Sequence, residues 1–134
     1  MKKYVLILSA FVVLASVSSC VKKCKEAGTG GSLTLVGKLQ HHGNTIINHI
    51  GYPDTVFVKF NTKDFPGTNP SSYDTYFVGD VGEDHVHMEN LKCGDYYLYA
   101  VGMDSTGPYR VSGGIPFSTE QESGEIVLYL PVTE

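Results

Sequence analysis

The sequence contains no tryptophan and only one arginine, and its 14 acidic residues outnumber its 10 basic ones. A chain with this balance lacks the basic face that nucleic acid requires, so nucleic acid is excluded as a partner. No serine lies in a Gly-x-Ser-x-Gly motif, and no glycine-rich loop precedes a helical pattern. These absences predict a protein that is not an enzyme and that uses no cofactor.

Long apolar runs are also missing, except at the N-terminus, where residues 4–17 follow two lysines. This run is shorter than the roughly 20 apolar residues that a membrane-spanning helix needs. Positive charge, a short apolar run and small residues, in this order, are typical of a secretory signal peptide. We therefore expect residues 1–19 to be removed during export.

Residues 17–20, Val-Ser-Ser-Cys, end this segment with a branched apolar residue, two small residues and a cysteine. They resemble the lipobox of bacterial lipoproteins, including those of the Bacteroidetes type, which implies that Cys20 is lipidated and begins the mature chain. Two or three acyl chains anchor a protein stably to a membrane. The residue after Cys20 is Val21 and not an aspartate, which in the sorting rule of enterobacterial lipoproteins implies the outer membrane. The sequence leaves open which face of that membrane carries the protein, since residues 21–25 lack the acidic run of surface-exported lipoproteins.

Two more cysteines follow. Cys24 lies in residues 20–32, which we expect to form a flexible tether because they include the glycine-rich stretch AGTGGS, and Cys93 lies in the domain that we expect over residues 33–134. In an oxidising compartment these two thiols either pair or stay free, and the sequence leaves both open. A bridge would close a loop of about 70 residues and stabilise the fold by about 4 kcal/mol.

Most of the chain after residue 32 alternates apolar and polar residues in short runs, and 15 glycines and six prolines fall mainly between these runs. This period of two predicts strands, and no sustained helical period is present. The predicted strands cover residues 32–39, 55–60, 73–78, 85–89, 96–102, 115–118 and 125–132. About seven strands in a chain of this size predict an all-β fold, a single antiparallel β-sandwich.

One segment resembles a known group of domains. Residues 90–96, NLKCGDY, lead into a predicted strand, and residues 124–130, GEIVLYL, form the closing one. Both resemble the carboxypeptidase regulatory-like domains of the transthyretin-like (prealbumin-like) sandwich group, except that Cys93 stands where a proline commonly precedes the glycine. The resemblance implies an Ig-like or transthyretin-like sandwich over residues 32–132. It also implies a module that accompanies catalytic or transport units without catalysis of its own.

Nine tyrosines make this residue type a candidate for binding. On a strand, Tyr96 would bury its ring and bond its hydroxyl to backbone at the sandwich corner, so Tyr97 and Tyr99 would point to the other side. With Tyr129 beside them, Tyr97 and Tyr99 would form a flat face for a sugar ring or a partner protein. Cross-strand aromatic pairs that stabilise the sheet are the other interpretation.

A second candidate is a metal site on the strand EDHVHME. His85, His87 and Glu89 would project from one face of this strand, about 7 Å apart, and imidazole and carboxylate are metal ligands. The alternative is that they are ordinary polar residues on a solvated face.

Together these observations predict an envelope lipoprotein, held to the membrane by its N-terminal lipid, that acts as a non-catalytic binding or scaffolding module for an envelope protein. A metal-binding protein that uses His85 and His87 and a glycan-binding module are the alternatives.

Overall fold

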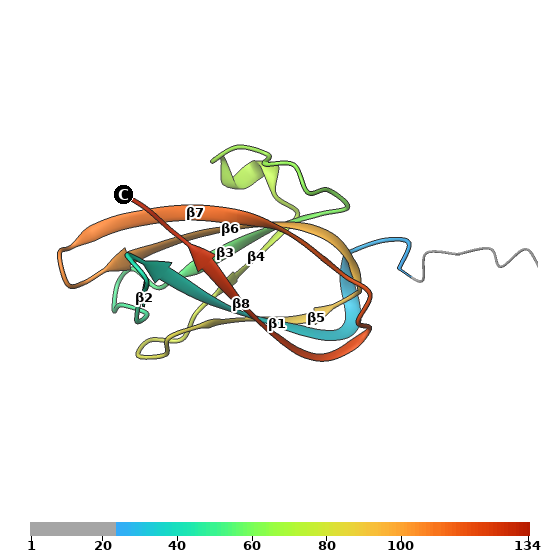
Figure 1. Cartoon of the computed structure of the whole chain (residues 1–134), viewed down its shortest axis with the longest axis horizontal. Coiled ribbons are helices and arrows are strands. Elements are labelled where there is room, and N and C mark those ends of the chain that lie inside the picture. Colours follow the sequence, from blue (N-terminus) through green and yellow to red (C-terminus); the bar gives the residue numbers. More distant parts are fainter. Residues whose placement is uncertain (1–23) are drawn as a thin grey trace, which may run out of the picture.

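The computed structural model describes residues 24–134, so the expected signal peptide (residues 1–19) and Cys20 lie outside the described residues. The described chain forms an all-β sandwich of about eight strands (Figure 1), and none of its residues lies in a helix that could cross a membrane. The strands are β1 (Thr29–His41), β2 (Asn44–Thr45), β3 (Thr55–Phe60), β4 (Thr75–Val78), β5 (Val86–Leu91), β6 (Gly94–Asp104), β7 (Tyr109–Thr119) and β8 (Ser123–Pro131), and a short 3-10 helix covers Pro70–Ser72.

The strands form two sheets that face each other (Figure 1). One has the order β4-β3-β6-β7 and is antiparallel throughout. In the other, β1 pairs with β5 and β2 in antiparallel fashion and with β8 in parallel. The predicted all-β sandwich is confirmed, and each of the seven predicted strands overlaps an observed one.

The parallel pairing of β1 with β8 differs from the purely antiparallel prediction. Its reason lies in the chain path: β6 leaves one end of the sandwich, β7 returns to that end, and β8 starts there after a short turn (Figure 1). Since β1 starts at the same end, the two strands run in the same direction. We call this end, which holds Cys24 and Cys93, the disulfide end, and the opposite end, which holds His41 and Asp104, the distal end.

The core lies between the sheets and consists of the alternate side chains that the period of two places inward. The largest side chains that are fully buried there belong to Tyr96, Leu33, Leu35, Leu39, Met88, Leu91, Leu98 and Leu130. Gly37 of β1 faces this core, where an added Cβ would lie 3.1 Å from both Leu130 and Met88. Side chains of the neighbouring strands β8 and β5 therefore pack closely over this glycine, and a larger residue at position 37 would crowd them.

Residues 24–32, which we expected to belong to a flexible tether, are part of the fold. β1 begins at Thr29, and Cys24 and Ala27 are buried. A Cβ on Gly31 would lie 2.1 Å from the carbonyl oxygen of Leu91, so this glycine is required by close contact with β5. The pairing of β1 with β5 shifts register at this point, as in a β-bulge. Gly31 is needed here for close packing and Gly30 for a positive φ of 88°, so these glycines belong to an ordered segment and not to a flexible linker.

Candidate functional site

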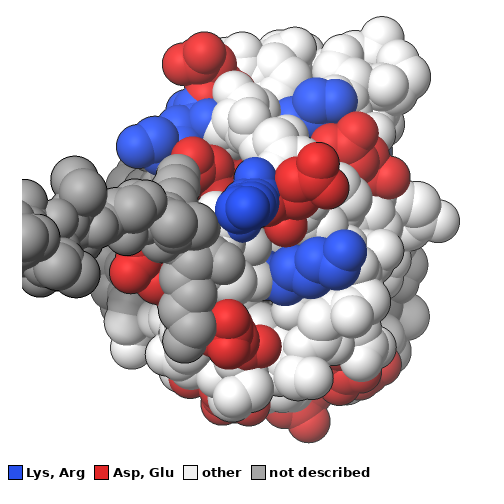
Figure 2. Space-filling view, turned by 90° about the vertical axis from the view of Figure 1, so that its right-hand side faces the viewer, with Lys and Arg blue, Asp and Glu red and all other residues white. Residues whose placement is uncertain are grey.

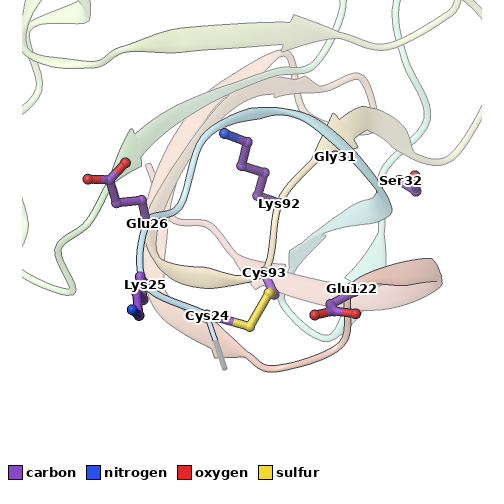
Figure 3. Close-up of a pocket in the computed structure, with 8 residues that line it drawn as sticks. All are labelled: Cys24, Lys25, Glu26, Gly31, Ser32, Lys92, Cys93 and Glu122. Atoms are coloured by element: carbon purple, nitrogen blue, oxygen red, sulfur yellow. A yellow bond between two sulfur atoms is a disulfide. The ribbon is translucent and has the colours of Figure 1, made fainter. Parts of the chain in front are cut away.

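A disulfide bond joins Cys24 to Cys93 across 69 positions of sequence, with the two Cα atoms 5.4 Å apart. Cys24 is 4% and Cys93 9% exposed, so the bond is largely shielded from solvent. It fastens the start of the described chain to the residue that precedes β6. Figure 3 shows it at one side of a hollow of about 330 Å³, whose other lining residues include Lys25, Glu26 and Lys92.

Hydrogen bonds reinforce this attachment. The backbone N–H of Ala27 donates to the side-chain oxygen of Asn61 at 2.8 Å, and the N–H of Lys92 donates to the carbonyl of Gly28, also at 2.8 Å. Gly94 makes room for this segment, because a Cβ there would lie 2.8 Å from the nitrogen of Ala27. The chain is thus held at the disulfide end by covalent, polar and packing contacts together.

Tyr96 joins the same two segments from the core side, and its buried ring and backbone-bonded hydroxyl are as the sequence predicted. Its ring is fully buried, and its hydroxyl donates to the carbonyl of Lys92 and accepts from the N–H of Gly28 at 3.2 Å. Burial raises the pKa of this hydroxyl, and its hydrogen bonds to the backbone of Gly28 and Lys92 partly offset that. Tyr96 therefore stays neutral and acts as a structural corner.

The surface around the disulfide end carries charges of both signs. Figure 2 shows lysine or arginine and aspartate or glutamate side chains interspersed on it, without a large area of one sign. Lys25 and Lys92 lie there beside Glu26 and Glu122. Among residues 24–134, the charges at this end thus form no extended patch of one sign.

An aromatic cluster covers the outer face of the β4-β3-β6-β7 sheet. We call it the aromatic face, and it consists of Phe57, Phe65, Tyr73, Tyr76, Tyr97 and Tyr99. The connection between β3 and β4, residues 61–74, crosses over the sheet (Figure 1) and brings Phe65 and Tyr73 onto it. The ring centroid of Phe65 lies 5.5 Å from that of Tyr97 and 5.8 Å from that of Tyr99, and Tyr73 stacks on Tyr99. Such contacts are worth about 0.5–1.5 kcal/mol each beyond their burial.

These contacts correct the expectation of an open tyrosine platform. Tyr99 is only 7% exposed and Tyr97 is partly buried, because Phe65 and Tyr73 cover them. Tyr129 is exposed, but it lies on β8 in the opposite sheet and cannot join them. Burial, followed by the nearby Tyr97 and Tyr99, raises the pKa of Tyr73 to about 12, and its hydroxyl donates to the carbonyl of Gly67 at 2.8 Å.

The part of the aromatic face that solvent reaches lies toward β4. Tyr76 is 62% and Phe65 53% exposed, and the neighbouring Val78 is 49% exposed. Sequence reasoning did not select Phe65 or Tyr76. The signal that was available is the apolar residue in the turn-rich stretch KDFPG, since an aromatic residue in such a loop needs a surface to pack against.

His85 and His87 lie together on the other sheet, at the start of β5. Their Nε2 atoms are 3.0 Å apart, and the Nδ1 atom of His85 lies 2.8 Å from a carboxylate oxygen of Asp84, which also pairs with Lys38 at 2.8 Å. The hydrogen bond from Lys38, followed by that from His85, lowers the pKa of Asp84. Lys38, Asp84, His85 and His87 thus form a chain of hydrogen bonds on the surface.

Within residues 24–134, one group alone places three or more candidate ligand atoms within 4.8 Å of one another, and it is His41, His42 and Glu134. The predicted ligand atoms of His85, His87 and Glu89 do not all lie within this distance of one another. His41 and His42 lie at the distal end of β1, whereas His85 and His87 lie on the outer face near Val36 and Gly37.

Asp54 is a buried acid that sequence reasoning missed. Asp54 is 0% exposed, and neither of its carboxyl oxygens has a hydrogen-bond partner among the described residues. Burial raises its pKa to about 7, and the nearby backbone N–H of Met103 offsets this only in part. Asn48 holds the segment in place, because its side-chain oxygen accepts from the N–H of Asp54 at 2.8 Å.

Comparison of the sequence with protein-family models and with curated proteins, and of the fold with solved structures, finds no match.

Proposed function

We propose that this protein is a lipid-anchored lipoprotein of the cell envelope that acts as a non-catalytic binding module for another envelope protein. The observation that carries the proposal is the attachment of Cys24 to Cys93. Cys24 follows the expected lipid-bearing Cys20 after only three residues. A lipid at Cys20 would therefore hold the disulfide end close to the membrane. The tether between lipid and fold would be three residues long, and not the 13 residues that the sequence predicts.

This attachment would also give the domain a preferred orientation. β1 starts at the disulfide end and runs the length of the sandwich to His41 at the distal end (Figure 1). With the disulfide end at the lipid surface, the distal loops point away from the membrane and the aromatic face lies on the flank. A module of this kind presents fixed surfaces to neighbouring proteins, which is the task of a scaffold.

The exposed part of the aromatic face is the surface we propose for the partner. Phe65, Tyr76 and Val78 are 53%, 62% and 49% exposed on one flank, and aromatic residues are enriched where proteins bind one another. The partly buried Tyr97 and the buried Tyr99 contact Phe65 on its inner side, so part of the surface is already ordered before binding. The resemblance to carboxypeptidase regulatory-like modules, which accompany other functional units, favours the same role.

A glycan-binding role finds less support, because the flat faces of Tyr97 and Tyr99 are covered by Phe65 and Tyr73. A protein partner needs only an apolar flank of the kind that Phe65 and Tyr76 form.

Lipid attachment is tested by expressing the full-length protein and a Cys20→Ser variant in cells fed with a radiolabelled fatty acid. We expect label and membrane fractionation for the parent protein and neither for the variant. Equal labelling of the two proteins, or no label in either, would contradict the anchor.

The binding surface is tested with a photo-crosslinking amino acid placed at Tyr76 and, as a matched control, at Tyr129. Both tyrosines are more than half exposed, at 62% and 56%, and they lie on opposite sheets. We expect a discrete crosslinked product in intact cells from position 76 that position 129 does not give. Identical products from both positions, or none from position 76, would remove the aromatic face as the binding surface.

A further inference from the structure

The distal end of the sandwich holds a buried histidine whose surroundings differ from those of an ordinary core residue. His41 is the last residue of β1 and is 2% exposed. Its Nδ1 atom lies 2.8 Å from a carboxylate oxygen of Asp104, the last residue of β6. Its Nε2 atom is buried and has no hydrogen-bond partner among the described residues. A buried ring nitrogen without a partner costs free energy, so it calls for an explanation.

Asp104 is held in place independently of His41. Its other carboxylate oxygen accepts from the backbone N–H of Thr106 at 3.0 Å and from the Thr106 hydroxyl at 2.7 Å. A carboxylate can only accept, so Nδ1–H of His41 donates to it, and in the neutral ring the lone pair is then on Nε2. A carboxylate that orients a histidine in this way is the usual outer partner of a metal-binding imidazole.

Two further candidate ligands surround Nε2. A carboxylate oxygen of Glu134 lies 3.6 Å from it, and the ring of His42 stacks on that of His41 with centroids 4.0 Å apart. The separation of 3.6 Å is too long for a hydrogen bond. It is close to the distance of about 3.4 Å between two ligand atoms that each lie about 2.1 Å from a tetrahedral Zn²⁺ ion.

The fold brings these three residues together from distant parts of the chain. His42 and Gly43 form the two-residue turn between β1 and β2, with φ angles of 49° and 80°. The chain after β8 is fixed beside them, since Val132 N–H donates to the carbonyl of Gln40 at 2.9 Å and Thr133 pairs with Ser112. Glu134 therefore emerges next to His41, with its side chain 54% exposed.

We propose that His41, His42 and Glu134 bind one divalent transition-metal ion of the Zn²⁺ class, with Asp104 as the group that orients His41. Two imidazoles and one carboxylate are a known ligand set for Zn²⁺ and leave a fourth position for water. Stacked rings do not aim their lone pairs at a common point, so the exposed His42 ring turns out of the stack when the ion binds. His41 and Asp104 keep their positions.

The test is calorimetric titration of the full-length protein in detergent, without reductant, with Zn²⁺ and with Mg²⁺ as the hard-cation control. The ligand variants are Glu134→Gln and His42→Asn, both at exposed side chains, and asparagine tolerates the positive φ at position 42. The matched control is His87→Ala, which removes an exposed histidine from the other cluster. Circular dichroism of each variant verifies that it folds.

We expect one Zn²⁺ per chain, no binding of Mg²⁺, an affinity at least about 10-fold lower in each ligand variant and an unchanged affinity in His87→Ala. In ¹⁵N-histidine spectra, Zn²⁺ should shift Nε2 of His41 while its Nδ1 keeps its proton. Zn²⁺ affinity that is equal in parent and ligand variants, or absent from the parent, would overturn the site. Affinity lost in His87→Ala and kept in Glu134→Gln would move the metal to the His85 and His87 cluster and overturn it as well.

Discussion

The hydroxyl of Tyr96 accepts a hydrogen bond from the backbone N–H of Gly28 at 3.2 Å, across 68 positions of sequence. Because the same hydroxyl donates to the carbonyl of Lys92, a single buried oxygen joins the start of the described chain to the turn that precedes β6. The Cys24–Cys93 bond spans nearly the same interval. Two independent devices thus fix the chain at the disulfide end.

Replacing Tyr96 by phenylalanine should remove one of these devices without changing the shape of the core. The N–H of Gly28 then loses its partner at a buried site, and we expect the free energy of unfolding to fall by about 1–3 kcal/mol. Urea denaturation measures this. Tyr129→Phe is the control, since its exposed ring on β8 should tolerate the change within about 0.5 kcal/mol. Equal effects of the two substitutions would show that the Tyr96 hydroxyl has no structural role.

The disulfide should contribute more than the tyrosine. The double variant Cys24→Ser, Cys93→Ser frees a loop of 69 positions in the unfolded state, and we expect a loss of about 4 kcal/mol. Reductant should lower the melting temperature of the parent protein and leave that of the variant unchanged. A parent protein that is insensitive to reductant would mean that the bond does not stabilise the fold.

Only part of the structure of the disulfide end could be predicted from the sequence. The period of two located the seven strands and the inward side of Tyr96. The same reasoning treated the glycines at positions 28, 30 and 31 as a linker, because a sequence does not reveal that Gly31 lies against the carbonyl of Leu91. Glycine is required both by flexible segments and by very close contacts, and only the three-dimensional pairing distinguishes the two.

Asp54 should make stability depend on pH in an unusual direction. Its pKa is about 7 in the folded protein, against 3.8 for an ordinary aspartate, so between about pH 4 and pH 7 the folded state holds a proton that the unfolded chain has released. The free energy of unfolding should therefore fall as the pH rises through this window, by up to about 1.4 kcal/mol per pH unit from this group, and level off above pH 7.

Asp54→Asn should remove this slope and be more stable than the parent protein at pH 8, because no charge has to be buried. The exposed Asp80→Asn should keep the parental slope and serves as control. Urea denaturation at pH 5, 6, 7 and 8 measures both. A parental slope that persists in Asp54→Asn would assign the pH dependence to another group.

The ring of Phe65 should shield Tyr97 and Tyr99 from solvent. Phe65→Ala removes its contacts with Tyr97 and Tyr99, and we expect a loss of about 1–3 kcal/mol together with faster chemical nitration of these two tyrosines. Tyr76→Ala, at the exposed edge of the same face, should leave their nitration rate unchanged. If Tyr97 and Tyr99 react equally fast in the parent protein and in Phe65→Ala, the cover over them is not closed in solution.

The sequence predicted the candidate sites less well than the strands. It identified Tyr97 and Tyr99 as outward-facing, but the cover by Phe65 depends on the path of residues 61–74, which no local pattern specifies. It also predicted no strand between residues 39 and 55, although the structure forms a two-residue turn at His42 and Gly43 that leads into β2. The proximity of His41 to Glu134 arises from the parallel pairing of β1 with β8, which no sequence period reveals.

The central claim is that a lipid at Cys20 and a disulfide at Cys24 together fix the domain to the membrane at one end. The most direct test is mass spectrometry of the protein purified from its native membrane without reductant and cut after glutamate. We predict a lipidated peptide of residues 20–26, linked through Cys24 to the peptide of residues 90–120 that contains Cys93. An unmodified Cys20 in a chain that retains residues 1–19, or free thiols at Cys24 and Cys93, would contradict the account.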